Sequence, residues 1–167
     1  KMKAYNIPTA EYEEFIDFES AKHYIMNANT YPIVIKANGL AAGKGVTIAQ
    51  SEDEAITALQ DCFLNNVFKE AGQKVIIEHF LKGEEASIFA FTDGNTVLPM
   101  VPSQDHKAIY DGDKGPNTGG MGAYSPAPLV TPEMEKRVLE TVFTPLVEGF
   151  KKDNINYNGI IYAGLMI

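Results

Sequence analysis

Two lysines and three glycines in the first third of the chain could hold the phosphates of a nucleotide. They are Lys36, at the end of a β-branched run, and in the turn after it Gly39, Gly43, Lys44 and Gly45. Glycine leaves its backbone N–H open to anionic oxygens, and lysine adds a compact, mobile positive charge. A P-loop does not fit, because only three residues separate Gly39 from Gly43 and the turn joins two predicted strands. The alternative is an ordinary hairpin with two solvated lysines.

Residues 78–85 could contact the base and the ribose of the same nucleotide. The segment joins two apolar runs and reads Glu78-His79-Phe80-Leu81-Lys82-Gly83-Glu84-Glu85. Backbone groups in such a connection can hydrogen-bond the edge of a base, and a following acid can accept hydrogen bonds from ribose hydroxyls. The alternative is an acidic turn with one histidine. The scattered histidines do not have the spacing of a zinc site.

A polar region between residues 103 and 124 could line a substrate site. Its first part is Gln104-Asp105-His106-Lys107, and its second part is Asn117-Thr118-Gly119-Gly120-Met121. The second part offers side-chain and backbone donors for a small polar or anionic substrate. Asp111 and Asp113 resemble the start of a calcium loop, but a third ligand in register and the closing glutamate are missing. The alternative is a rigid structural loop.

Alternating helices and strands are expected to position these three segments. Helices are predicted over residues 20–29, after the capping box of Ser51 and Glu54, and from Thr131 to about residue 150. Strands are predicted over residues 31–37, 46–49, 75–78, 86–91, 96–98 and 157–167, the first two forming a hairpin. The last strand stops at the chain end although a buried strand needs partners, so we expect a piece of a longer protein.

The composition predicts an acidic, soluble, intracellular domain of mixed α/β type. The chain has 167 residues, 22 acids against 14 Lys and Arg, a net charge of −8 and one arginine, Arg137. This charge argues against nucleic-acid binding. No stretch approaches the ~20 apolar residues of a membrane span, and the start has no signal-peptide core. The single cysteine, Cys62, fits a reducing cytosol.

Four segments in order resemble the phosphoribosylamine–glycine ligases (glycinamide ribonucleotide synthetases), a family of the ATP-grasp superfamily. The segments are residues 32–46, 83–87, 103–107 and 115–126. The resemblance covers nearly the whole chain, from Ile7-Pro8-Thr9-Ala10 to Tyr162-Ala163-Gly164-Leu165-Met166. It implies an α+β, ATP-grasp fold with two lobes of antiparallel sheet and helices. Residues 1–167 would be a partial ATP-grasp domain truncated on its C-terminal side, with 8–80 as the smaller, nucleotide-clamping lobe and 81–167 as the first part of the larger lobe.

The resemblance also implies roles for individual residues. Lys36 and Lys44 would contact the phosphates and act in catalysis, while Gly43 and Gly45 let the turn close over them. Glu78 would meet adenine through its carbonyl or carboxylate, Leu81 through its amide, and Glu85 would hold the ribose, with Glu84 as second choice. The implied nucleotide-binding residues are Lys36, Gly43, Lys44, Gly45, Glu78, His79, Phe80, Leu81 and Glu85. The residues implied for glycine and 5-phosphoribosylamine are Asp105, His106, Lys107, Asn117, Thr118, Gly119, Gly120 and Met121.

The implied reaction makes glycyl phosphate from ATP and glycine, after which the amine of 5-phosphoribosylamine displaces phosphate, a step of de novo purine biosynthesis. It needs no enzyme nucleophile, only positioning and charge neutralisation. The family's Mg²⁺ ligands, in a Glu-Phe-Asn-x-Arg-Phe-Gly-Asp segment, would follow Ile167, so we expect no metal ligand within this chain and negligible activity from it alone.

The partners expected are therefore ATP, glycine, 5-phosphoribosylamine and the remaining domains of the same polypeptide, with no nucleic acid or membrane, in the cytoplasm. Two alternatives stay open. One is an ATP-grasp ligase for another carboxylic acid, which the 103–124 region would decide. The other is a non-catalytic nucleotide-binding module.

Overall fold

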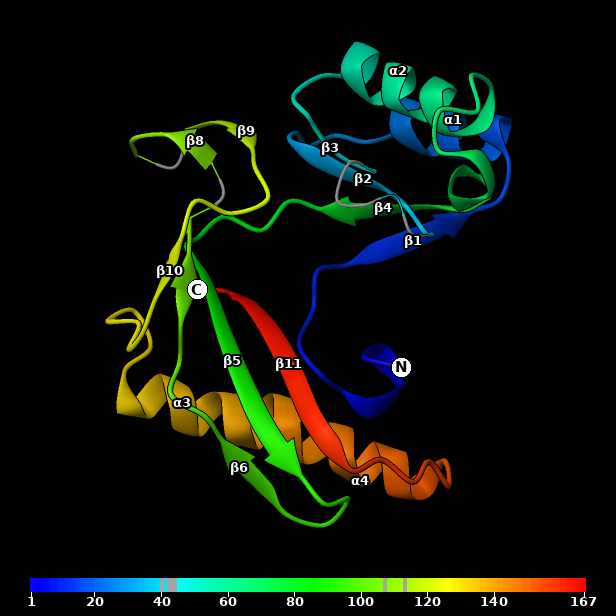
Figure 1. The fold of residues 1–167 in the computed structure, drawn as a ribbon. Helices are drawn as coiled ribbons and strands as arrows, with labels where there is room; N and C mark the ends of the chain where they lie inside the picture. Colours follow the sequence, from blue (N-terminus) through cyan, green and yellow to red (C-terminus); the bar gives the residue numbers. More distant parts are fainter. Residues whose placement is uncertain (40, 42–44, 107, 113) are drawn as a thin grey trace. The chain divides into compact units, whose positions relative to one another are not determined.

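The chain divides into two compact units (Figure 1). The structure, a computed structural model, describes residues 1–39, 41, 45–106, 108–112 and 114–167, with only the backbone of Pro116 and Asn117. Residues Ala10–Leu81 form the inserted unit, and residues Lys1–Thr9 with Lys82–Ile167 form the main unit. Each unit combines helices with antiparallel strands, which confirms the α+β class.

The inserted unit is a four-stranded sheet with two helices on one face. Its strands are β1 (Tyr12–Phe15), β2 (Ile33–Ala37), β3 (Val46–Ala49) and β4 (Val75–His79), which pair antiparallel in the order β1-β4-β2-β3. Its helices are α1 (Phe18–Met26) and α2 (Glu52–Phe63), followed by the 3-10 turn η2 (Lys69–Gln73). The predicted β2–β3 hairpin is confirmed. The sequence did not predict β1, because its Tyr-Glu-Glu-Phe pattern lacks the alternation of a half-buried strand.

Alternate residues of the inserted sheet form the core with the helices. Ile35 and Ile77 of the central strands are buried together with Ile25 of α1 and Leu59 of α2. Successive strand residues point to opposite faces, so this core leaves the intervening residues on the other face. Cys62 lies in the same core, and its burial raises the pKa of the thiol.

Side-chain caps begin both helices of the inserted unit. The Asp17 carboxylate accepts a hydrogen bond from the Ser20 amide at 2.9 Å, and the Ser51 hydroxyl accepts one from the Glu54 amide at 3.3 Å. The second hydrogen bond of the predicted capping box involves a different residue from the one expected. The Glu54 carboxylate reaches the amide of Gln50 at 2.7 Å, one residue before the cap.

The main unit has a three-stranded sheet in the order β11-β5-β6. The strands are β5 (Glu85–Thr92), β6 (Val97–Pro99) and β11 (Gly159–Met166), and β11 pairs with β5 along its whole length. Asp93 shapes the turn from β5 to β6, because its carboxylate accepts hydrogen bonds from the amides of Thr96 and Asn95. The same two hydrogen bonds lower the pKa of Asp93.

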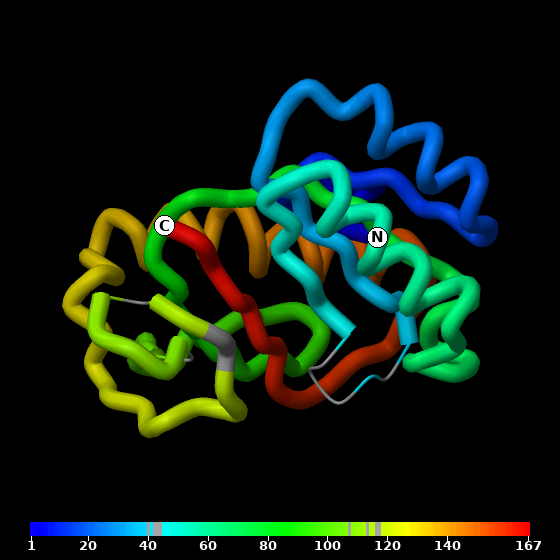
Figure 2. Tube along the Cα trace, turned by 90° about the horizontal axis from the view of Figure 1, so that it is seen from above, coloured from blue at the N-terminus to red at the C-terminus, as the bar shows by residue number. Residues whose placement is uncertain are grey.

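One long helical segment covers a face of this sheet and runs behind β11 in the turned view (Figures 1 and 2). It consists of α3 (Pro132–Val138), the π-helical turn η3 (Leu139–Phe143) and α4 (Thr144–Lys152). The predicted cap is present, since the Thr131 hydroxyl accepts a hydrogen bond from the Met134 amide. The π turn was not predicted. It precedes Pro145, which has no N–H and would clash with the carbonyl one turn earlier in a regular helix.

Short strands occupy the polar region between residues 103 and 124. They are β7 (Gln104–Asp105), β8 (Ala108–Tyr110), β9 (Lys114–Asn117) and β10 (Ala123–Tyr124). β7 pairs with β10, and β8 pairs with β9. Two backbone hydrogen bonds between Ser103 and Ser87 attach the start of this region to β5. It therefore has a defined position within the main unit.

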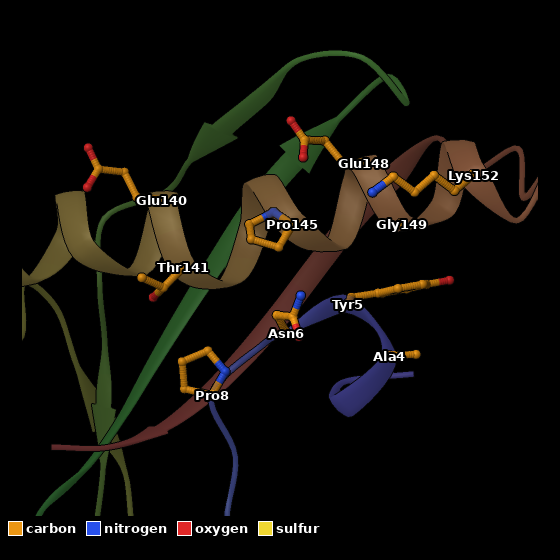
Figure 3. Close-up of a pocket in the computed structure, with 10 residues that line it drawn as sticks. All are labelled: Ala4, Tyr5, Asn6, Pro8, Glu140, Thr141, Pro145, Glu148, Gly149 and Lys152. Atoms are coloured by element: carbon orange, nitrogen blue, oxygen red, sulfur yellow. The ribbon is translucent and has the colours of Figure 1, made fainter.

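The first residues of the chain pack on α4 of the main unit. The 3-10 turn η1 (Lys3–Tyr5) places the Tyr5 ring against Gly149, and Tyr5 donates a hydrogen bond to Asp153. A pocket of about 410 Å³ lies between this turn and the helix (Figure 3), and none of the predicted site residues lines it. In the described part of the chain, no helix is long and apolar enough to cross a membrane.

Candidate functional site

The inserted sheet has an open face, which the helices of its own unit do not cover. The residues on it include Val34, Lys36, Val46, Ile48, Ile76 and Glu78. Val34 stands opposite both Glu78 and Ile48, and Lys36 stands opposite both Val46 and Ile76. Val46 and Ile48 are 48% and 42% exposed. The open face is therefore mostly apolar and carries one lysine and one glutamate near its centre.

Lys36 and Glu78 form an ion pair on this open face. The Lys36 Nζ lies 2.6 Å from Glu78 Oε2, and their side chains are 38% and 22% exposed. The two residues are diagonal neighbours on the adjacent strands β2 and β4. An ammonium group has three donors, so the pair leaves Lys36 able to donate to a further anion. The pair brings together the predicted phosphate residue and the predicted adenine residue.

The residues after Glu78 lie in different environments. His79 alternates with Glu78 and so points to the other face of the sheet, where its Nδ1 lies 3.7 Å from the carboxylate of Glu11. The His79 amide donates to the Glu11 carbonyl at 2.9 Å. Phe80 and Leu81 extend beyond the strand with exposed side chains. The His79 side chain therefore does not share the open face with Lys36.

The glycine-rich turn is described in part. The Gly45 carbonyl accepts a hydrogen bond from the Ala37 amide at 2.8 Å, which closes the hairpin next to Lys36. A Cβ atom at Gly45 would lie 2.7 Å from the Cβ of Ala41, so only glycine fits here without a shift. Gly43 and Lys44 lie outside the described residues.

The main sheet also has an open face, opposite its helix. Phe89, Phe91, Ile160 and Tyr162 lie on it, and Glu85 lies at one end of it, opposite Met166. Phe91, Ile160 and Tyr162 are about half exposed. Glu84 exchanges two backbone hydrogen bonds with Ile167, which fixes the approach to β5. Glu85, the predicted ribose residue, therefore stands at the rim of an apolar surface.

The two segments predicted to line a substrate site lie together in the main unit. A Cβ at Gly120 would lie 2.9 and 3.0 Å from the carboxylate oxygens of Asp105, and Gly120 has φ +107°. The Gly120 amide donates to the hydroxyl of Thr118 at 3.1 Å. Met121 is exposed, and Gly119 lies beside Gly120 in an exposed turn. Asn117 ends β9, opposite Ala108, and Lys107 lies outside the described residues.

A polar network spans the paired strands β7 and β10. Tyr124 donates a hydrogen bond from its hydroxyl to Oε1 of the buried Gln104 at 2.6 Å. The same hydroxyl lies 3.5 Å from Nε2 of His106, and the rings of Tyr124 and His106 are 5.8 Å apart. Oδ1 of Asp105 is buried and has no hydrogen-bond partner among the residues that the structure describes.

Sequence reasoning placed Gln104 and Tyr124 within the polar region between residues 103 and 124 but gave neither residue a role of its own. Both lie within the segments that carry the family resemblance, and this was the available signal. Their hydrogen bond could not be predicted, because it depends on the pairing of two strands of two residues each.

The described residues contain no group of three or more His, Cys, Asp or Glu side chains that could hold a metal ion. The described residues alone therefore do not form a complete magnesium site.

The whole chain resembles one family of known proteins. The family model for the phosphoribosylglycinamide synthetase ATP-grasp (A) domain matches residues 1–167. The chain is 53% identical to a phosphoribosylamine–glycine ligase from Yersinia pestis and 55% identical to one from Pseudomonas aeruginosa. Each alignment covers 98% of this chain and 38% of the relative, so the chain spans less than half the length of these proteins.

Solved structures agree with this assignment. A crystal structure of phosphoribosylamine–glycine ligase from Thermotoga maritima matches with a TM-score of 0.87 and 36% identity, over 99% of this chain and 41% of that chain. A D-alanine–D-alanine ligase from Bacillus anthracis, at 21% identity and a TM-score of 0.61 over 99% of this chain and 48% of that one, shares the fold alone. The chain belongs to the phosphoribosylglycinamide synthetase ATP-grasp (A) domain family.

Proposed function

We propose that the full-length protein containing this chain joins glycine to 5-phosphoribosylamine and converts ATP to ADP and phosphate. The observation that carries this proposal is the match over the whole chain to relatives that bear the name of that ligase. The Lys36–Glu78 pair and the Asp105–Gly120 contact support it, because they provide separate places for a nucleotide and for a small polar substrate.

The inserted unit is assigned to the nucleotide. Its open face offers valine and isoleucine side chains to an adenine ring, and Lys36 offers ammonium hydrogens to the phosphates. Glu78 holds Lys36 in place, and either its carbonyl or its carboxylate reads the base together with the Leu81 amide. Lys44 and Gly43 complete the phosphate contacts, and Glu85 accepts hydrogen bonds from the ribose. In this assignment the inserted unit is the smaller, clamping lobe and the main unit begins the larger lobe.

The reaction then proceeds in two displacement steps. A carboxylate oxygen of glycine attacks the γ-phosphorus of ATP, the bond to the bridging oxygen breaks, and ADP leaves. The amine nitrogen of 5-phosphoribosylamine attacks the acyl carbon of glycyl phosphate, phosphate leaves, and the nitrogen loses a proton. The protein's part is to bring the groups together and to place positive charge beside the transferred phosphoryl group, which suits a lysine held at a fixed position.

The test is ADP formation by the full-length natural protein in the presence of ATP and magnesium. Glycine and 5-phosphoribosylamine are supplied together and separately, and alanine replaces glycine in a control. We expect steady ADP formation and an amide product only when glycine and 5-phosphoribosylamine are both present.

Two results would overturn this proposal. ADP formation that depends on another carboxylic acid and ignores glycine would indicate a different ligase of the same fold. Nucleotide binding without ADP formation under any of these conditions would indicate a non-catalytic module.

A further inference from the structure

The open face of the main sheet changes from apolar to polar along its length. The strands β5 and β11, which lie side by side (Figure 1), contribute four facing pairs to it: Phe91 with Ile160, Phe89 with Tyr162, Ser87 with Gly164, and Glu85 with Met166. The first two pairs are aromatic and aliphatic. The apolar part therefore ends at Tyr162, and a serine and a glycine separate it from the row of Glu85.

The Tyr162 hydroxyl has a defined position at this boundary. Its ring packs against the ring of Phe89, with the centroids 5.1 Å apart, and its hydroxyl oxygen lies 3.3 Å from Oγ of Ser87. A Cβ at Gly164 would lie 2.9 Å from the same oxygen, so the missing side chain of Gly164 makes room for the hydroxyl. These three neighbours fix the orientation of a side chain that is 55% exposed.

The two hydroxyls lie next to residues already assigned to ligands. Ser87 follows Glu85 by two residues on the same face of β5, which is about 7 Å along a strand. Ser87 also exchanges two backbone hydrogen bonds with Ser103, at the start of the polar region between residues 103 and 124. One hydrogen joins the two hydroxyls, so the second O–H can donate to a ligand.

We propose that the Tyr162 hydroxyl, oriented by Ser87, donates a hydrogen bond to a phosphate oxygen of the bound nucleotide. This inference rests on the proposed function, which assigns the base to Leu81 and the ribose to Glu85. The phosphates continue from the ribose away from the base, and in that direction the next polar side chains of the open face are these two hydroxyls. A hydroxyl suits an anionic oxygen, because hydrogen bonds to charged acceptors are the stronger ones.

The experiment replaces Tyr162 by phenylalanine in the full-length protein, which removes the hydroxyl and keeps the ring against Phe89. Titrations with a non-hydrolysable ATP analogue, ADP and adenosine measure the three dissociation constants. We expect the Kd of the ATP analogue to rise by about tenfold, with the Kd of adenosine within about twofold of the parent value. The result with ADP shows whether the contacted phosphate is the terminal one. The KM values for glycine and 5-phosphoribosylamine should change by less than about twofold.

Three further variants complete the test. Tyr157→Phe is the matched control, because Tyr157 lies in the same unit and donates its hydroxyl hydrogen to the carbonyl of Ile160 at 2.6 Å. It should change none of the dissociation constants. Gly164→Ala places a Cβ where the Tyr162 hydroxyl lies and should also raise the Kd of the ATP analogue. Ser87→Ala should raise it less, because the Tyr162 hydroxyl remains.

An unchanged Kd of the ATP analogue in both Tyr162→Phe and Gly164→Ala would overturn the inference. An equal rise in the Kd of adenosine would also overturn it, because adenosine has no phosphate. A rise confined to the KM for glycine would assign the hydroxyl to that carboxylate instead. Failure of the proposed function gives a different result: the unaltered protein would bind the ATP analogue but form no ADP that depends on glycine and 5-phosphoribosylamine.

Discussion

The Lys36–Glu78 ion pair and the Asp105 carboxylate are both charged groups within candidate binding regions, but within the described part of the chain only the ion pair is fully partnered. Lys36 and Glu78 lie on adjacent strands of a regular sheet, where the register places opposite charges side by side. Asp105 lies where two very short strands meet a glycine turn, and one of its oxygens has no donor in the described ranges of the chain. The ion pair is complete without a ligand, whereas Oδ1 of Asp105 lacks a donor among the described residues.

This difference separates two ways of holding a substrate. A neutralised pair on an apolar face can remain partly buried without ligand and still offer ammonium hydrogens to phosphates. A carboxylate oxygen without a donor lowers the stability of the free protein. A ligand that donates a hydrogen bond to this oxygen binds more tightly, because it supplies the missing bond.

The largest effect is expected from removing the positive charge of the pair. Lys36→Ala should lower kcat/KM for ATP by about 100-fold or more, because the charge beside the transferred phosphoryl group is lost. The matched control is Lys74→Ala. Lys74, the residue before β4, pairs with Glu14 of β1 at 2.5 Å, and its side chain is 37% exposed, close to that of Lys36. Steady-state kinetics should show a change of less than about threefold for Lys74→Ala. Equal losses of kcat/KM in both variants would mean that Lys36 has no specific role in the reaction with ATP.

The second largest effect is expected from adding a side chain at Gly120, in the turn next to Asp105, which should reduce stability. Gly120→Ala places a Cβ against the carboxylate at a φ of +107°, so we expect a loss of about 1–3 kcal/mol in the free energy of unfolding. Denaturant melts of Gly120→Ala, Asp105→Ala and the double variant measure the coupling. It should be at least about 0.5 kcal/mol, because the two residues are in contact. Additive effects would show that Asp105 and Gly120 do not touch in solution.

The hydrogen bond between Tyr124 and Gln104 should contribute to stability more than to substrate binding. Tyr124→Phe removes the hydrogen donated to the buried Gln104 and should cost about 1–2 kcal/mol of stability. The KM values for glycine and 5-phosphoribosylamine should change less than in Asp105→Asn, because the hydroxyl bonds within the protein. Thermal unfolding and the same kinetic assay test both parts. A larger KM change than in Asp105→Asn would move the binding role to Tyr124.

The smallest effects are expected from replacing the carboxylates of Glu78 and Asp105 by amides, and they concern stability. Glu78→Gln breaks a partly buried ion pair and should lower stability by about 1 kcal/mol. Asp105→Asn replaces a half-buried carboxylate whose Oδ1 has no partner among the described residues, and it should leave stability unchanged or raise it by up to about 1 kcal/mol. Chemical denaturation of both variants in one buffer supplies the comparison. Losses of the same size would remove the distinction between a satisfied and an unsatisfied carboxylate.

Sequence reasoning predicted much of the inserted unit and less of the 104–124 region. The β-branched run before the glycine turn and the strand after it predicted the hairpin that carries Lys36. The ion pair with Glu78 could not be predicted, because β4 lies between β1 and β2 and its register joins residues about 40 positions apart. Strands of two residues leave no periodic pattern, so the contact between Asp105 and Gly120 had no local signal.

The helical segment of the main unit shows the same limit. Its start was predicted because Thr131 and Pro132 make a recognisable cap. The π turn before Pro145 was not, because the sequence shows the missing N–H but not how the backbone adjusts around it.

The central claim is that the inserted unit holds the nucleotide while the Asp105 region holds a small polar substrate. Hydrogen exchange on the full-length protein tests it, with a non-hydrolysable ATP analogue added first and glycine and 5-phosphoribosylamine added afterwards. We expect the analogue to slow exchange in segments 36–46 and 78–82, and an amine substrate to slow exchange in segment 104–124 only when it is added. Protection of 104–124 by the nucleotide alone, with none in the inserted unit, would contradict the account.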